Sequence, residues 1–309
     1  MKYLITRILL FCMPLFLYIL IVFFIDPYDI VRTENNPKLK KLKSEISYKL
    51  NYPLYKLKRY ALNPTDIIIL GDSRANKLNT AVFENLTKST VTNLAYGGGT
   101  LTEMIETFWY VVGVHEVKEV YIGISFFNYN ETLNMNRVSE AKEITNSLPL
   151  YLLSTYCLKS TFLICKSLVT NEEIDIGVPT QNREEFWSYQ LESSANNLYR
   201  GYKYSNQLSR RLSEISKYCD SNNIKLIFFN PPSHTDLQLK VSKFKLELEK
   251  SKFNDDISNL GLYFDFDFSN DITENRDNFS DPFHYNDSIA NIVVNEIISG
   301  VVKYGKTYD

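Results

Sequence analysis

Hydrophobic and polar positions along this chain form blocks that predict a repeated order of strand and helix. Short apolar runs that end at glycine, asparagine or proline are too short for buried helices and are typical of strands covered on both faces. Longer stretches between them have the apolar spacing of helices. Because strands alternate with helices, we expect an α/β fold of three layers, in which a central parallel sheet lies between helices. The predicted strands cover residues 66–70, 90–95, 116–127, 225–230 and 262–266, and the predicted helices cover residues 101–112, 191–222, 236–252 and 288–303.

The amino-terminal apolar run predicts a membrane anchor. Residues 8–25 contain no charged residue, follow Lys2 and Arg7, and end at Asp26. As a helix, this run is long enough to cross the hydrocarbon core of a bilayer. No cleavage site with small residues lies near its end, which favours an uncleaved signal anchor over a removed signal peptide. The basic residues on its two sides predict opposite orientations. Long domains translocate largely regardless of nearby charge, so we expect a single-pass protein with an extracytoplasmic main domain.

The rest of the pattern divides the chain into parts. Residues 1–26 form the anchor, residues 27–63 are polar and Lys-rich, and residues 64–303 form the main domain. We interpret the second part as a partly helical stalk or linker in solvent, although its lysines could also contact anionic lipid or an anionic envelope polymer. Within the main domain, the alternation of strand and helix is lost at about 128–190. We interpret that stretch as an insertion or lid.

Composition and charge restrict the classes of function. The chain has 309 residues, 44% of them hydrophobic, which is ordinary for one large globular domain or two small ones. Its formal net charge of −2 gives no general attraction to nucleic acid, so we expect no nucleic-acid partner. The cysteines outside the anchor lack the spacing of metal ligands, and we expect no metal and no cofactor. Cys157 and Cys165 could form one disulfide, but free buried thiols are the simpler interpretation.

The strand at 66–70 ends at Gly71, Asp72 and Ser73, which are the first candidates for chemistry. A glycine permits a tight turn that other residues resist. A serine in the first helical turn after it has an exposed hydroxyl close to free backbone N–H groups with partial positive charge. Ser73 is therefore a candidate nucleophile. Asp and Ser also commonly cap helices, and this stretch alone leaves both interpretations open.

The three histidines differ in their expected positions. His115 precedes a strand, at the edge of the sheet opposite to the carboxyl ends where ligands bind, and we expect it to be structural. His234 follows the strand at 225–230 on the correct edge and is either a substrate contact or a structural residue. His284 follows Asp281 by three residues, so one carboxylate can hold one imidazole nitrogen while the other nitrogen stays available. A general base and its orienting group have this relation in a catalytic triad.

These pieces together resemble the SGNH, or GDSL-like, hydrolases and acyltransferases, which have a flavodoxin-like sheet. The matching segments are Gly71 to Ser73, Asn93 to Gly98, and Asp281 to His284. The resemblance implies that Ser73 is the nucleophile, that His284 and Asp281 complete the triad, and that the N–H groups of Ser73 and Gly98 form an oxyanion hole. The Gly-x-Asn-Asp block of the family is absent, and Asn128 stands where its asparagine is expected. Loss of a side-chain donor would slow catalysis by about a hundredfold or more.

Within this family the chain is similar to membrane-anchored members of cell-envelope polysaccharide gene sets, such as those that O-acetylate alginate or help to move D-alanine onto teichoic acids. The similarity implies a serine acyltransferase or esterase that acts on an envelope polysaccharide beside a multi-pass membrane acyltransferase. The sequence does not distinguish hydrolysis from transfer. A catalytically silent scaffold that binds glycan or the acyltransferase is an alternative, and a lipase or thioesterase is another.

Overall fold

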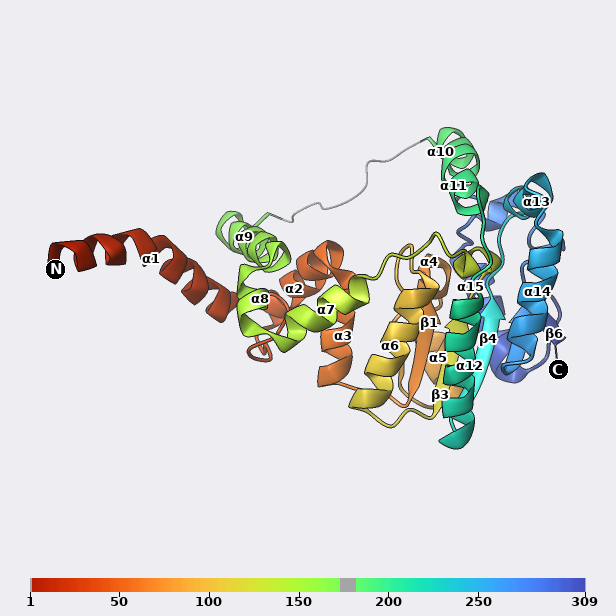
Figure 1. Cartoon of the computed structure of the whole chain (residues 1–309), viewed down its shortest axis with the longest axis horizontal. Coiled ribbons are helices and arrows are strands. Elements are labelled where there is room, and N and C mark those ends of the chain that lie inside the picture. The colour runs from red at the N-terminus through yellow and green to blue at the C-terminus, as the bar shows by residue number, and fades with distance from the viewer. Residues whose placement is uncertain (1, 173–181, 309) are drawn as a thin grey trace. The chain divides into compact units, whose positions relative to one another are not determined.

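The computed structural model describes residues 2–172 and 182–308, which fold as two compact units (Figure 1). An α/β unit is formed by Asn63–Asn136 and Thr180–Asp309. A helical unit is formed by Met1–Leu62 and Arg137–Pro179. The predicted stalk therefore folds together with residues 137–172 of the predicted insertion, while residues 173–181 of that insertion lie outside the described residues.

The α/β unit is built on a six-stranded sheet with the strand order β2-β1-β3-β4-β5-β6. The first five strands are parallel, and their order is that of a flavodoxin-like doubly wound sheet. The prediction of an α/β fold around a mostly parallel sheet is confirmed. β6 was not predicted, and it pairs antiparallel with β5. The strands are β1 Ile67–Gly71, β2 Val91–Asn93, β3 Glu119–Gly123, β4 Lys225–Asn230, β5 Leu262–Asp265 and β6 Lys306–Tyr308.

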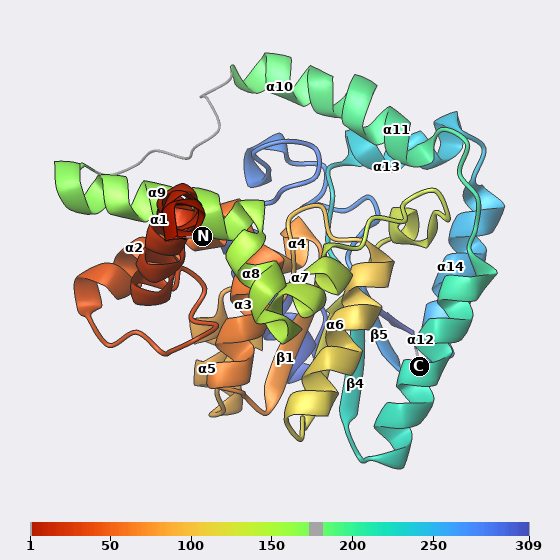
Figure 2. The ribbon, with the colours of Figure 1, turned by 60° about the vertical axis from the view of Figure 1, so that its left-hand side comes forward.

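Helices cover both faces of this sheet. α5 and α15 pack on each other and share a core with one face, while α6 and α12 pack on each other and on the other face (Figure 2). The predicted helix at 191–222 is wrong in its middle, because α11 ends at Tyr199 and α12 begins at Asn206. The helices are α4 Ser73–Asn76, α5 Thr80–Thr87, α6 Leu101–Val114, α10 Arg183–Tyr189, α11 Asn196–Tyr199, α12 Asn206–Ser221, α13 Thr235–Lys243, α14 Glu247–Ser258 and α15 Asp287–Ser299, with short 3-10 or π turns η1 Phe126–Tyr129, η2 Gln190–Ala195 and η3 Arg276–Asn278.

The centre of the sheet is packed closely where β1 ends. All five residues of β1 are buried, and each isoleucine removed from water stabilises the fold by about 1.5–3 kcal/mol. Gly71 pairs with Gly123 of β3 and has a φ of +153°. A Cβ atom on Gly71 would lie 2.4 Å from the Cβ of Ala75, and one on Gly123 would lie 2.7 Å from the same atom. The two glycines therefore let α4 approach the strands, which fixes the position of Ser73.

The helical unit contains an apolar amino-terminal helix and five shorter ones. Tyr3–Ile25 of α1 is long and apolar enough to cross a membrane. Within the unit, α2 packs on α9 and α3 packs on α7. Cys157 and Cys165 are free thiols on α9; eight residues of helix separate them by about 12 Å, which is beyond the reach of a disulfide. The helices are α1 Lys2–Ile25, α2 Pro37–Leu50, α3 Tyr52–Leu62, α7 Arg137–Asn146, α8 Leu148–Leu153 and α9 Thr155–Thr170.

Buried charges hold the predicted stalk inside this unit. The Lys43 ammonium is fully buried and donates to Asp29 at 2.6 Å. Arg59 of α3 lies 3.1 Å from the other oxygen of the same carboxylate. The Asp26 carboxylate accepts the backbone N–H groups of residues 30–32 at 2.8–3.0 Å and the hydroxyl of Tyr151 at 2.6 Å. The lysines that suggested a solvated linker therefore include one that ties α2 to a turn.

Candidate active site

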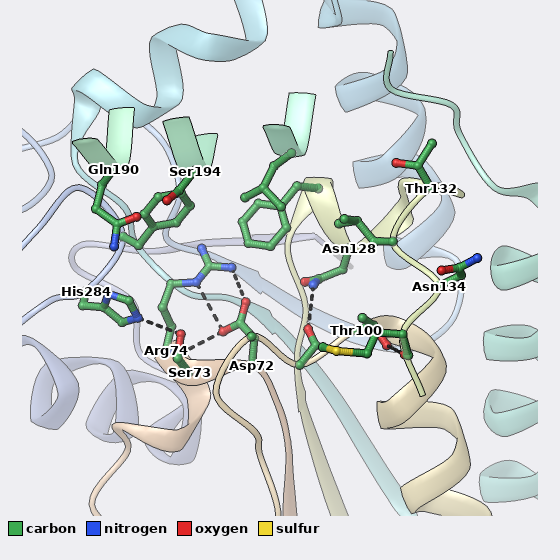
Figure 3. A pocket seen from close by; sticks show the side chains of 17 residues that line it. Asp72, Ser73, Arg74, Thr100, Asn128, Thr132, Asn134, Gln190, Ser194 and His284 are labelled. Atoms are coloured by element: carbon green, nitrogen blue, oxygen red, sulfur yellow. Dashed lines mark hydrogen bonds and ion pairs between the residues drawn. The ribbon is translucent and has the colours of Figure 1, made fainter. Parts of the chain in front are cut away.

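A cavity of about 400 Å³ opens at the edge of the sheet where the parallel strands end (Figure 3). Such an edge is where ligands bind in open α/β sheets. Every lining residue belongs to the α/β unit. They are Asp72, Ser73, Arg74, Gly98, Gly99, Thr100, Phe127, Asn128, Thr132, Leu133, Asn134, Met135, Gln190, Ser194, Leu198, Phe283 and His284.

Three of the predicted site residues form a line of hydrogen bonds at this cavity. Ser73 Oγ lies 2.7 Å from His284 Nε2, and Figure 3 marks this contact with a dashed line. His284 Nδ1 lies 2.7 Å from Asp281 Oδ2. The other oxygen of Asp281 accepts the backbone N–H of Phe283 at 2.8 Å and that of His284 at 3.2 Å. The carboxylate is therefore held by its own loop and fixes the imidazole with Nε2 directed at the serine hydroxyl.

The residues next to Ser73 show which side chain caps α4 and which hydroxyl stays available for chemistry. Asp72 is the N-cap of α4 and accepts the backbone N–H of Arg74 at 2.9 Å. The Arg74 guanidinium is buried and donates to both oxygens of Asp72, at 2.7 and 3.3 Å. Because Asp72 takes the capping role, the Ser73 hydroxyl is left to bond with His284. The two interpretations of this stretch thus apply to two different residues.

Three donors predicted for an oxyanion hole also line the cavity. Gly98 has a φ of +61° in a turn closed by a 3.0 Å bond from Gly99 N–H to Tyr96 O, and its own N–H donates to no described residue. A turn with positive φ at this position favours glycine. The Ser73 N–H begins α4 and so lies outside the hydrogen-bond ladder of that helix.

Asn128 is held in one orientation by the 3-10 turn η1. Its Oδ1 accepts the Ser125 N–H at 2.8 Å, and its Nδ2 donates to Gly99 O at 3.3 Å. An amide nitrogen has two protons, so one remains for a ligand in the cavity. Figure 3 shows the Asn128 amide beside the cavity.

A buried polar chain lies behind the site and was not foreseen. Arg74 also donates to the Ser125 hydroxyl, which donates to Asn230 Oδ1 at 2.9 Å, and Asn230 Nδ2 donates to Asp265 Oδ1 at 3.0 Å. Burial, with the nearby charge of Asp267, raises the pKa of Asp265 to about 6. A sequence signal existed, because Asn230 and Asp265 each end an apolar strand at the edge that carries the site.

His234 is not among the residues that line the cavity, and its contacts are with neighbouring side chains and backbone. Its ring is buried between Trp187 and Phe279, at centroid distances of 4.9 and 5.7 Å. Nδ1 accepts the Asp236 N–H at 3.1 Å, which caps α13, and burial lowers the pKa of this imidazole. The backbone N–H of His234 donates to Pro282 O at 3.0 Å and so supports the loop that carries the acid and the base.

His115 has the structural position expected for it. Its Nε2 lies 3.0 Å from Asp66, which directly precedes β1 at the opposite edge of the sheet. Both ends of the predicted insertion contribute cavity walls, with residues 132–135 after η1 and Gln190 at its other end. Ser194 and Leu198 lie beyond the predicted insertion and project from the same side of the η2 and α11 segment as Gln190, because the three are four residues apart.

Comparisons with known proteins give no family for this chain. No family model matches it, and no curated protein matches it. One matching solved structure is described as "a putative platelet activating factor from Streptococcus pneumonia", with 9% sequence identity and a TM-score of 0.44. The match covers 86% of this chain and 99% of that one. A likeness this distant supports no conclusion about fold or function.

Proposed function

We propose that this protein is a membrane-anchored, extracytoplasmic serine acyltransferase or esterase of the SGNH type that acts on an envelope polysaccharide. The observation that supports the proposal is the line from Asp281 through His284 to the Ser73 hydroxyl at the mouth of a cavity. A nucleophile, a base and an orienting carboxylate in hydrogen-bond contact are the parts that acyl transfer requires.

The proposed reaction proceeds through an acyl-enzyme. Ser73 Oγ attacks the carbonyl carbon of an ester while His284 Nε2 takes the hydroxyl proton, and Asp281 stabilises the imidazolium. The carbonyl oxygen becomes an oxyanion that the N–H groups of Ser73 and Gly98 and the amide of Asn128 stabilise. His284 returns the proton to the leaving alcohol. Water or a sugar hydroxyl then attacks the carbonyl carbon of the acyl-enzyme while His284 takes its proton, and His284 gives that proton to Ser73 Oγ as the bond between Oγ and the acyl carbon breaks.

The cavity suits a neutral acyl group and a hydroxyl-rich acceptor. The charges of Asp72 and Arg74 neutralise each other within the wall. Phe127 and Phe283 supply apolar surface, while neutral side chains such as Gln190 and Asn134 can donate and accept hydrogen bonds. This lining favours an uncharged ester over a phosphate or carboxylate substrate.

The proposed location and partner depend on α1. A single helix of this length and apolarity would hold the chain in one membrane, with the α/β unit on the extracytoplasmic side. The proposed partner is a multi-pass acyltransferase that brings the acyl group across that membrane and loads Ser73.

Labelling with a fluorophosphonate probe tests the proposed chemistry. We expect the full chain in detergent to be labelled, the label to be lost in Ser73→Ala, and the label to be kept in Ser89→Ala, which removes an exposed serine hydroxyl elsewhere. Release of acetate from an aryl acetate, with and without added polysaccharide, then separates hydrolysis from transfer. A folded wild-type chain that takes no label would contradict the proposal and favour a catalytically silent scaffold.

A further inference from the structure

We propose that the helical unit makes a second contact with the membrane, in which one face of α8 and α9 lies in the interfacial layer of lipid. This inference goes beyond the proposed chemistry and depends only on the anchoring of α1. We call this surface the α8–α9 face. It consists of Leu148, Leu150, Leu153, Leu158, Phe162 and Val169.

The α8–α9 face is apolar and uncovered within its own unit. Its six side chains are between 50% and 82% exposed. On α9, Leu158, Phe162 and Val169 share one side because they are four and seven residues apart. The opposite side of α9 carries Cys157 and Ile164, which are fully buried. The exposed side of α9 therefore adds nothing to the core of the unit, and large apolar side chains left exposed together with those of α8 indicate an interaction site.

Contacts with α1 indicate which surface covers this face. The Tyr18 hydroxyl of α1 donates to the Leu152 carbonyl of α8 at 2.7 Å. Tyr18 lies seven residues before the end of α1 at Ile25, which is about 10 Å along a helix. Phe23 and Phe24, beyond Tyr18, are still exposed and apolar. If lipid surrounds α1 down to these residues, α8 lies beside a part of α1 that is already at membrane depth.

This placement agrees with the contact between α1 and α9, and Figure 1 shows that the carboxyl-terminal end of α1 is the part that reaches α8 and α9. Ile25 at the end of α1 packs with Ile164 of α9 and with Leu42 and Ile46 of α2. The base of α1 and the α8–α9 face are thus parts of one packed body. Amphipathic helices bound to a membrane surface lie about 5–10 Å into the boundary between headgroups and acyl chains, a depth of the same size as the length of α1 between Tyr18 and Ile25.

The charges beside the α8–α9 face favour a lipid surface. Residues 148–170 contain two lysines and no acidic residue. Lys159 and Lys166 are exposed and lie seven residues apart, beside the apolar stripe of α9. Lys38 reaches the end of α9 and donates to Asn171 Oδ1 at 3.0 Å. Long basic side chains can keep their apolar stems in the acyl layer and their ammonium groups among anionic headgroups.

Fluorescent probes on the full chain test the inference in vesicles of phosphatidylcholine and phosphatidylglycerol. The accessible native thiols are removed by Cys12→Ala and Cys165→Ser, while the buried Cys157 and Cys219 stay. An environment-sensitive nitrobenzoxadiazole probe is then attached at Phe162→Cys or Val169→Cys. Glu143→Cys on the exposed side of α7 is the matched solvent control in the same unit. Native Cys12, kept in a separate variant, is the matched control inside α1.

We expect blue-shifted emission at positions 162 and 169, with several-fold stronger quenching by lipids that carry a shallow nitroxide than at position 143. Emission and quenching equal to those at 143 would overturn the inference. Shielded probes that lipid nitroxides do not quench would also overturn it, because a second copy or another protein would then cover the face. A probe at Cys12 that lipids with a nitroxide deep in the acyl chain do not quench would refute the anchoring itself. Fluorophosphonate labelling of the same samples reports the catalytic proposal separately.

Discussion

The two units of this protein use buried polar residues for different purposes. In the α/β unit, polar side chains at the ends of β3, β4 and β5 form a continuous chain behind Arg74 and the cavity. In the helical unit, Asp26, Asp29 and Lys43 bind distant segments of backbone and side chain to one another. The buried polar side chains of the α/β unit lie around a site, whereas those of the helical unit take the place of part of an apolar core.

This difference shows that polar residues in a sequence can belong either to a site or to the interior of a unit. Many apolar residues of the helical unit face outward, on α1 and on the α8–α9 face. Interactions between buried charged groups therefore hold more of its interior together. The α/β unit turns its apolar residues inward and confines uncommon polar groups to one edge of its sheet.

The largest effect is expected from removing the general base. His284→Gln should reduce turnover of an aryl acetate by about 10⁴-fold, because no other group lies in line between Asp281 and the serine hydroxyl. His115→Gln is the matched histidine control at the opposite edge of the sheet and should leave turnover unchanged. Equal turnover in the two variants would show that the cavity does not work as a triad site.

A large effect on stability is expected in the helical unit. Lys43→Met leaves the buried carboxylates of Asp29 and Glu34 without their ammonium partner and should lower the free energy of unfolding by about 3–5 kcal/mol. Lys40→Met, at an exposed position of the same helix, should change it by less than about 0.5 kcal/mol. Denaturant unfolding in detergent measures both. Labelling of Ser73 in Lys43→Met should equal that of the wild type, and its loss would show that the effect of the substitution is not confined to the helical unit.

A smaller effect on catalysis should follow from removing the amide donor. Asn128→Ala should lower kcat by about 10²- to 10³-fold, the usual cost of one oxyanion donor. Because Asn128 also bonds to Ser125 N–H and Gly99 O, unfolding must be measured alongside the rate. Asn128→Asp keeps the acceptor for Ser125 but removes the donor, and it should be as slow as the alanine variant. A fast aspartate variant would mean that the amide only supports the turn.

The smallest effect concerns the close approach of α4 to the sheet. A Cβ on Gly123 would lie 2.7 Å from the Phe229 ring and from Ala75, so Gly123→Ala should destabilise the α/β unit by about 1–3 kcal/mol. Gly113→Ala in α6 meets no atom within 4 Å and should stabilise by about 0.5–1 kcal/mol. Thermal unfolding of the two variants compares them. A neutral Gly123→Ala would show that the contact is not tight.

Much of the α/β unit could be predicted because its signals are local. The isoleucine run of β1, the glycine at its end and the spacing of Asp281 and His284 are readable over a few residues, and the sheet order then brings them to one edge. The break between α11 and α12 and the three residues of β6 have no such pattern. The position of His234 depended on which way a side chain turns after Pro232, and that is set by tertiary packing.

The helical unit was the harder part to predict. Lys43 stands among four other lysines within residues 38–49, and nothing local distinguishes the buried one from the exposed ones. Asp29, the partner of Lys43, lies in a turn. The helix that carries Lys43, α2, packs on α9, more than a hundred residues away in sequence. A charged stretch therefore suggested a solvated stalk, whereas long-range pairing makes it an interior element.

The two outermost strands of the sheet have a consequence for solubility. β2 and β6 each contain three residues, and β6 begins with Lys306. Short edge strands, one of which begins with a positive charge, leave few unpaired backbone groups to which another chain could add a strand. They therefore oppose edge-to-edge aggregation. Many copies anchored side by side in one membrane would be at a high local concentration. The short edge strands would then help to keep the sheet of one copy from pairing with that of the next.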